Sequence, residues 1–235
     1  MSGRERARPA LVVFAKVPEA GRVKTRLSPP LAPDEAAALY AAFLGDALGR
    51  YAALGAAPGG PAVRLYVGGD PADSRLDGLV PDGVARFRQR GGGLGERMLR
   101  ASVETFAAGH DRAVVVGTDH PTLPDAFFGL AFGALDDPLT VALGPSDDGG
   151  YYLLGLNDIV PDLFDMAYSH GRVFEDTLER AMEADLTPVV LPPHYDVDDA
   201  GGLARLVQEW RGGADIGGRT ARVLRTLTER GRLAA

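Results

Sequence analysis

The sequence predicts an α/β protein with a mixed, mainly parallel sheet that is covered by helices on both faces, a three-layer α/β/α arrangement. Short apolar runs alternate along the chain with longer helical patterns, which is the order of elements in such folds. Several runs are apolar at every position, as strands buried on both faces are. Only a short connection precedes residues 150–156, so we expect that strand to be antiparallel.

The expected strands are runs of apolar and β-branched residues. The run 10–15, ALVVFA, and the run 112–117, RAVVVG, are typical of buried central strands. The run 84–89 is a weaker pattern. The remaining expected strands are residues 62–67, 139–144, 150–156 and 187–192.

Helical patterns fill the intervals between these strands. The first, 34–48, begins at Pro-Asp-Glu, where a helix start favours a proline and acidic residues. A glycine-rich turn leads into the helical pattern within 91–109. Residues 52–62 are expected to form a flexible surface loop. Further helices are expected at 123–135, 173–184, 200–210 and 217–231.

Length and composition limit the class of protein. The 235 residues are expected to form one domain, 1–235, with a core over about 10–210. The absence of cysteine excludes disulfides and thiolate metal sites. The net charge of -7 argues against a nucleic-acid partner. The charged N-terminus and the short apolar run after it do not form a signal or spanning segment, so we expect a cytoplasmic protein without a membrane partner.

A concentration of cations follows the first strand. Lys16, Arg22, Lys24 and Arg26 lie within eleven positions against a single acid, Glu19, in a chain that is acidic overall. In sheets of this kind ligands bind beyond the carboxyl ends of the strands. We therefore interpret the loop as a site for a phosphate-bearing anion, while a solvated basic loop remains the alternative.

The glycines of this loop do not match the known phosphate-binding motifs. Gly21 could allow main-chain N–H groups to approach an anion. No glycine directly precedes Lys24, so the loop is not a Walker motif, and the G-x-G-x-x-G fingerprint is absent from it.

Three aspartates form a candidate metal site. Asp119 follows the strand 112–117, where it could bind a cation or cap the turn into the next helix. Asp196 and Asp198 alternate in an extended segment, so their carboxylates should point the same way. Either Asp198 or Asp199 could instead cap the following helix. An oxygen-only set favours Mg²⁺ or Mn²⁺ over Zn²⁺, and His120 is given no role.

Two further segments are candidates for contacting a substrate. GPSDDGGYY places Asp148 before two glycines, either to bind a substrate hydroxyl or to stabilise a turn. Residues 91–98, GGGLGERM, could wrap a nucleotide base or serve as a permissive helix entry. Ser169, His170 and Arg172 precede a helix start and could form a second anion pocket or act as capping and surface residues.

Together these motifs resemble a bacterial transferase family of the nucleotide-diphospho-sugar transferase (GT-A) superfamily, often labelled selenodomain-associated transferase. The resemblance covers roughly residues 10–205. It is carried, in order, by AKVPEAGRVKTRLSP, GTDHPTLP, GPSDDGGYYLLGL and YDVDDAGGL. The segments KTRLSP and DVD are also similar to 2-phospho-lactate guanylyltransferase.

The resemblance implies a GT-A-like, Rossmann-related fold and particular roles for the candidate residues. Lys24 and Asp119 are the expected catalytic residues, and Asp119, Asp196 and Asp198 the expected metal ligands. The expected nucleotide-binding residues are Ala15, Lys16, Gly21, Lys24, Arg26, Gly95 and Thr118. The expected substrate-binding residues are Asp148, Gly149, Gly150, Ser169 and Arg172.

Three functions are compatible with these residues. The preferred one is Mg²⁺-dependent transfer of a nucleoside monophosphate from an NTP to a small phosphorylated acceptor, with release of pyrophosphate. The second is glycosyl transfer from an NDP-sugar on the same fold. The third is a nucleotide-binding module without catalysis, against which the three carboxylates argue.

Overall fold

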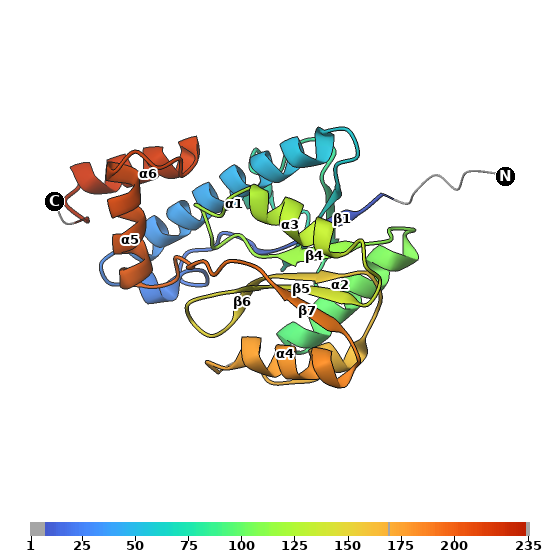
Figure 1. Cartoon of the computed structure of the whole chain (residues 1–235). Coiled ribbons are helices and arrows are strands. Elements are labelled where there is room, and N and C mark those ends of the chain that lie inside the picture. The colour runs from blue at the N-terminus through green and yellow to red at the C-terminus, as the bar shows by residue number, and fades with distance from the viewer. Residues whose placement is uncertain (1–7, 169, 234–235) are drawn as a thin grey trace.

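The computed structural model describes residues 8–168 and 170–233 and has the predicted α/β fold (Figure 1). The described residues form one seven-stranded sheet in the order β3-β2-β1-β4-β6-β5-β7. Strand β6 is antiparallel to both of its neighbours, as expected from the short connection before it, and the other neighbouring strands are parallel. The strands are β1 Ala10–Lys16, β2 Ala62–Gly68, β3 Ala85–Arg88, β4 Ala113–Val116, β5 Thr140–Pro145, β6 Tyr151–Leu156 and β7 Thr187–Val190.

The helices cover both faces of the sheet, as predicted. Helices α1 and α3 contribute to the core on one face, and α2 and α4 to the core on the other (Figure 1). Helices α5 and α6 pack with the beginning of α1 around a third apolar cluster. The helices of the described chain are α1 Pro33–Ala56, α2 Leu94–Ala107, α3 Ala126–Ala134, α4 Val173–Glu183, α5 Ala200–Arg211 and α6 Gly218–Glu229.

The predicted loop at 52–62 is wrong in its first half. Helix α1 continues to Ala56, because Tyr51 and Gly55 extend its buried face against the sheet. Gly55 lies so close to Pro61 that an added Cβ would stand 2.7 Å from the Pro61 carbonyl oxygen. Short 3₁₀ helices that the patterns did not predict occur at Thr25–Leu27, Ser74–Leu76 and Pro161–Phe164.

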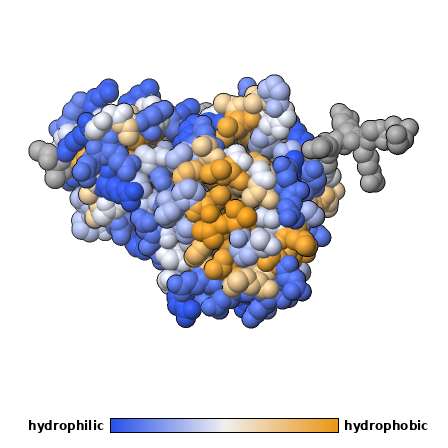
Figure 2. Space-filling model, in the orientation of Figure 1, coloured by the Kyte–Doolittle hydropathy of each residue, from blue (hydrophilic) through white to orange (hydrophobic). Residues whose placement is uncertain are grey.

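Apolar side chains gather on the surface over α3 and the neighbouring edge of the sheet (Figure 2). Leu130, Leu139 and Val190 are each more than half exposed there. Strand β7 ends the sheet on this side and contains Pro188, which has no N–H group to offer another strand. None of the described helices is both long enough and apolar enough to cross a membrane.

The start of α1 is held by Glu35, whose side chain is only 7% exposed. Its carboxylate accepts a hydrogen bond from the Ala32 N–H at 2.9 Å and pairs with Arg232 at 3.1 Å and Arg230 at 3.6 Å. The hydrogen bond from Ala32 is the main reason that the pKa of Glu35 lies below its ordinary value, and the two arginines add to it. Ionised Glu35 therefore stabilises the junction between α1 and the C-terminal segment.

We expect Glu35→Ala to lower the free energy of unfolding by about 1–2 kcal/mol at neutral pH, since it removes a helix-start hydrogen bond and an ionic partner of two arginines. A lowered carboxyl pKa contributes stability above the unfolded-state pKa, and that contribution is lost as the pH falls through the folded-state pKa. The difference from the unmutated protein should thus shrink in acid. Urea unfolding across this pH range measures it, with the exposed Asp34→Ala as control; a difference that stays constant in acid would contradict the assignment.

Candidate active site

Two adjoining cavities lie beyond the carboxyl ends of β1 and β4, where ligands bind in sheets of this kind. The first, the basic cavity, has a volume of about 380 Å³ and includes Lys16, Lys24 and Arg97 in its lining. The second, the acidic cavity, has a volume of about 320 Å³ and includes Asp148 and Asp196. Both cavities are lined by Phe14, Leu94, Gly117, Asp119 and Asp198, so they are two halves of one cleft.

Lys24 lines the basic cavity and pairs with the two carboxylates that both cavities share. Its Nζ is 2.6 Å from Asp119 Oδ1 and 3.4 Å from Asp198 Oδ1, and its side chain is 2% exposed. The ammonium also lies 5.9 Å from the ring centre of Tyr40 and 6.0 Å from that of Phe43. The backbone of Lys24 has φ 48°, an uncommon conformation for a residue other than glycine, at the entry to the 3₁₀ turn Thr25–Leu27. Lys24 is therefore not part of a solvated basic loop.

The other predicted residues of this loop lie in different places. Arg26 contacts the Asp198 carboxylate and lines the acidic cavity. Ala15 and Lys16 line the basic cavity, and the Lys16 N–H donates to the Tyr40 hydroxyl at 2.8 Å. Gly21 has φ 76° and lies in an exposed part of the loop that lines neither cavity.

Asp119 and Thr118 follow β4 and face the cleft. Burial by itself would raise the pKa of Asp119. The charge of the Lys24 ammonium and its hydrogen bond, with smaller contributions from His120 and Lys16, together outweigh this effect and hold the pKa below its ordinary value. Asp119 is thus ionised at neutral pH. It does not cap α3, whose N-cap residue is Asp125. Thr118 is buried and lines the basic cavity.

In the segment before α5, one aspartate caps the helix and two others line the cavity. Asp199 is the helix cap, since its side chain accepts a hydrogen bond from the Gly202 N–H at 2.9 Å. Asp196 and Asp198 therefore need another explanation, and both line the acidic cavity. Burial and, next, the charge of Asp148 raise the pKa of Asp196. Asp196 forms no ion pair with a described residue, in contrast to Asp198.

The oxygen donors of this cleft are of the type that binds a divalent cation, but their positions are not those of a metal site. Asp119, Asp196 and Asp198 offer only carboxylate oxygens, which Mg²⁺ and Mn²⁺ prefer. In residues 8–168 and 170–233, however, no group of three or more acidic or histidine side chains is arranged to hold a metal ion. The Lys24 ammonium instead lies against two of the three carboxylates, and it supplies the positive charge that they require.

Some of the predicted substrate-binding residues line the acidic cavity and others do not. Asp148 and Gly150 line the acidic cavity, and Asp148 Oδ1 also accepts from the Gly150 N–H at 2.9 Å, so it stabilises its own turn. Gly149 has φ 84° and meets the next loop, where an added Cβ would stand 2.0 Å from the Gly171 carbonyl oxygen. Arg172 is exposed, pairs with Glu175 at 2.7 Å and lines neither cavity. Ser169 lies outside the described residues.

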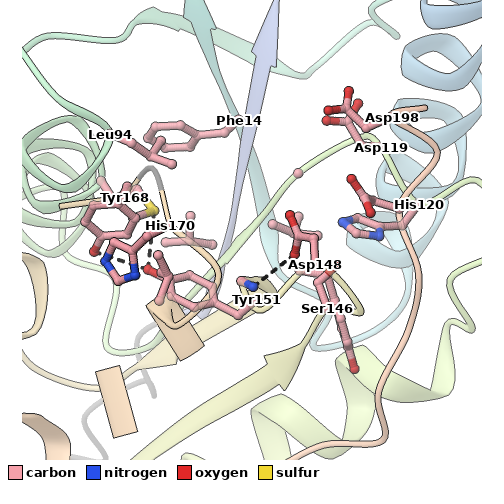
Figure 3. Close-up of a pocket in the computed structure, with 18 of the residues that line it drawn as sticks. Phe14, Leu94, Asp119, His120, Ser146, Asp148, Tyr151, Tyr168, His170 and Asp198 are labelled. Atoms are coloured by element: carbon pink, nitrogen blue, oxygen red, sulfur yellow. Dashed lines mark hydrogen bonds between the residues drawn. The ribbon is translucent and has the colours of Figure 1, made fainter. Parts of the chain in front are cut away.

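Phe14, His120 and Tyr168 were missed because only tertiary contacts bring them to the cleft. His170, named as part of a possible anion pocket, lines the acidic cavity, and Leu94 and Arg97 of the candidate segment 91–98 also line the cleft. His120, to which no role was assigned, is buried, lines the acidic cavity and bonds the Tyr195 carbonyl oxygen through Nδ1 at 2.9 Å. Figure 3 shows Phe14, Leu94, Tyr168 and His170 on the side of the acidic cavity opposite Asp119, Asp198 and His120, with Asp148 between. Arg97 adds a cation to the basic cavity.

Gly95 was expected to bind the nucleotide, but its role in the structure is close packing. It lies in the first turn of α2, and an added Cβ would stand 2.3 Å from the Phe164 carbonyl oxygen and 2.5 Å from the Tyr168 ring. Gly95 lines neither cavity. The absence of a side chain at Gly95 instead allows the Phe164–Tyr168 segment to approach α2 and carry Tyr168 to the cleft.

The seven-stranded mixed sheet with helices on both faces matches the fold of a nucleotide-diphospho-sugar transferase-like (GT-A-like) crystal structure, as expected. The chain belongs to the family described as "Uncharacterized protein conserved in bacteria" (DUF2064), whose profile matches residues 52–170. No curated protein sequence matches it. A crystal structure from Desulfovibrio desulfuricans G20, provisionally described as a nucleotide-diphospho-sugar transferase, is 31% identical, with a TM-score of 0.86 over 97% of this chain and 100% of that one.

More distant structures share the fold. A cytidylyltransferase from Leptospira borgpetersenii serovar Hardjo-bovis is 12% identical, with a TM-score of 0.57 over 96% of each chain. The manganese complex of Rv0371C from Mycobacterium tuberculosis H37Rv is 18% identical, with a TM-score of 0.52 over 86% of this chain and 99% of that one. The fold is therefore one on which transferases are built.

The packing of Gly95 predicts a stability defect. We expect Gly95→Ala to lower the free energy of unfolding by about 1–3 kcal/mol, because the added methyl group overpacks the contact with Phe164. Chemical denaturation measures this loss. Gly93→Ala is the matched control, since an added Cβ at Gly93 meets no atom within 4 Å. If Gly95→Ala left the stability unchanged but weakened nucleotide binding, the packing assignment would be wrong and a direct contact of Gly95 with the nucleotide would be supported.

The position of Lys24 predicts an effect on metal binding in the absence of nucleotide. We expect Lys24→Met to tighten Mn²⁺ binding by at least about tenfold, because Asp119 and Asp198 lose the ammonium that now offsets their charges. Electron paramagnetic resonance of free Mn²⁺ measures this affinity. Lys16→Met, which removes a cation without a direct carboxylate contact, should change it much less. Equal or weaker Mn²⁺ binding by the Lys24 variant would show that the Lys24 ammonium does not compete with the metal ion for Asp119 and Asp198.

Proposed function

We propose that this protein is a divalent-metal-dependent nucleotidyltransferase that joins a nucleoside monophosphate from an NTP to a small phosphorylated acceptor and releases pyrophosphate. The observation that carries the proposal is the division of one cleft into a basic and an acidic cavity that meet at Asp119 and Asp198. A donor and an acceptor that bind in the two halves would bring their reacting groups together at that boundary. The resemblance of KTRLSP and DVD to 2-phospho-lactate guanylyltransferase supports the same reaction.

In this proposal the basic cavity receives the triphosphate. Lys16, Lys24 and Arg97 neutralise its oxygens, and Thr118 and Ala15 lie in the wall against which it binds. An oxygen of the acceptor phosphate attacks the α-phosphorus, a new P–O bond forms, and the bond to the β-phosphate oxygen breaks. Pyrophosphate leaves with that electron pair. The acceptor phosphate is already a nucleophile, so no general base is required.

Asp119, Asp196 and Asp198 would hold Mg²⁺ or Mn²⁺ at the boundary between the cavities. When bound, the ion would offset charge on the reacting phosphates. Lys24 must then exchange its carboxylate partners for phosphate oxygens. The low exposure of Lys24 favours this exchange, because a buried ammonium requires an anionic partner at every stage.

Glycosyl transfer from an NDP-sugar is the second candidate. The relative from Desulfovibrio desulfuricans carries the provisional description of a nucleotide-diphospho-sugar transferase, which favours it. Asp148 would then contact a sugar or acceptor hydroxyl from the acidic cavity. Incubation of the protein with Mg²⁺ and NTPs plus phosphorylated acceptors, or with NDP-sugars, separates the two. Pyrophosphate release supports the first candidate, and transfer or hydrolysis from NDP-sugars alone replaces it with the second.

The proposal predicts strong effects from single carboxylates. Asp119→Ala and Asp198→Ala should each lower Mg²⁺-dependent pyrophosphate release by at least about 100-fold, because each removes charge at the reacting phosphates. Lys24→Ala should weaken nucleotide binding. Circular dichroism should show an intact fold in all three variants. Asp136→Ala, which removes only a surface pair with Arg112, is the control, and full activity of Asp119→Ala would sink the metal assignment.

A further inference from the structure

The charges around the acidic cavity are not those of a simple phosphate site. Arg26 is the only arginine or lysine among the described residues that line it, and Arg26 already contacts Asp198. Four carboxylates line the same cavity, and two of these, Asp148 and Asp196, form no ion pair with a described residue. An acceptor that is negatively charged throughout would therefore face uncompensated carboxylates.

The wall opposite Asp119 and Asp198 is mainly aromatic and also contains Leu94 and His170. Phe14, Tyr151 and Tyr168 line it, and their rings come from β1, β6 and the segment after the Pro161–Phe164 turn (Figure 3). The Tyr151 hydroxyl bonds the Tyr168 hydroxyl at 3.3 Å, and the Tyr168 hydroxyl bonds the Leu163 carbonyl oxygen at 3.4 Å. Because both hydroxyls are engaged within the protein, the surface that these residues offer a ligand is mainly ring carbon.

Ring carbon beside unpaired carboxylates is a surface that binds organic cations. Aromatic rings attract an ammonium group through the negative potential of their faces, and a nearby carboxylate adds a direct charge interaction. Asp148 lies between the aromatic wall and the Asp119–Asp198 boundary (Figure 3). An ammonium bound near Asp148 would therefore lie between the aromatic wall and the reacting phosphate.

We infer that the acceptor is a zwitterion: a small phosphomonoester whose far end carries a quaternary or protonated amine, held by Asp148 and the aromatic wall of the acidic cavity. This inference rests on the proposed function for the phosphate end, which binds toward Arg26 and the Asp119–Asp198 boundary. The ammonium end rests on the lining of the acidic cavity alone. The phosphate end of the acceptor would thus meet the cation Arg26, and its ammonium end would meet the carboxylate of Asp148.

Two probes of equal shape test the ammonium end. Phosphocholine and 3,3-dimethylbutyl phosphate differ only by a quaternary nitrogen in place of a quaternary carbon. Calorimetric titration of the full chain with Mg²⁺ should show phosphocholine binding at least about tenfold more tightly, since one partly desolvated cation contact changes affinity by about that factor. Equal or tighter binding of the carbon analogue overturns the inference, as does tighter binding of glucose 1-phosphate or no binding of either ester.

Matched variants locate the effect. Asp148→Asn keeps an oxygen to accept from the Gly150 N–H, so the turn should persist, yet the preference for phosphocholine should fall to near one. Asp147→Asn, whose exposed side chain pairs with Arg205 at 3.1 Å, should leave the preference unchanged. Tyr168→Leu should reduce it, whereas Tyr168→Phe, which keeps the ring, should not. A preference that survives both Asp148→Asn and Tyr168→Leu overturns the assignment.

The same samples keep this inference separate from the proposed function. Pyrophosphate release from NTPs is assayed with each phosphate ester as acceptor. A preference for phosphocholine without pyrophosphate release would leave the cation site standing and reject nucleotidyl transfer. Pyrophosphate release with acceptors that lack an amine, together with equal binding of the two probes, would keep nucleotidyl transfer and reject the zwitterionic acceptor.

Discussion

The ion pairs of one buried ammonium, that of Lys24, hold the site together. A charged group that is almost fully removed from water must be paired, and the partners of Lys24 come from two other segments of the chain, the loop after β4 and the segment before α5. Two contacts fix the same junction, the Val197 N–H to the Asp119 carbonyl oxygen at 2.9 Å and His120 Nδ1 to the Tyr195 carbonyl oxygen at 2.9 Å. Three segments distant in sequence are thus required to meet where the parallel strands end.

The rest of the architecture supports this junction. Helix α1 places Tyr40 and Phe43 against the Lys24 ammonium, and Glu35 at its first turn connects it to the C-terminal segment. On the other side, Asp199 caps α5 and so ends the extended segment that carries Asp196 and Asp198. Gly95 allows the Phe164–Tyr168 segment to close on α2, and that contact completes the aromatic wall. Each of these features acts on the cleft by positioning a neighbour.

The sequence was sufficient for the parts of the molecule that depend on local pattern. Buried strands such as β1 and β4 are apolar at nearly every position, and the short connection before β6 identified the one strand that runs against its neighbours. Asp119, Asp196 and Asp198 could be identified as candidate site residues because helix capping and turn formation do not account for all three carboxylates. What the pattern could not predict depends on distant contacts: the left-handed backbone of Lys24, the packing role of Gly95 and the burial of His120.

Cations from the first loop neutralise two of the four carboxylates of the cleft, Asp119 and Asp198. Under the proposed function each ligand exchanges one of these internal pairs for an external one. A polyphosphate that pairs with the Lys24 ammonium leaves Asp119 and Asp198 free to bind a cation. A cation bound to those carboxylates likewise leaves Lys24 free to bind phosphate. Each ligand then removes part of the cost of binding the other, and this coupling is reciprocal by linkage. It also gives an acidic chain a reason to concentrate cations in one loop: they are the exchangeable half of a charge pair whose other half is the carboxylates of the cleft.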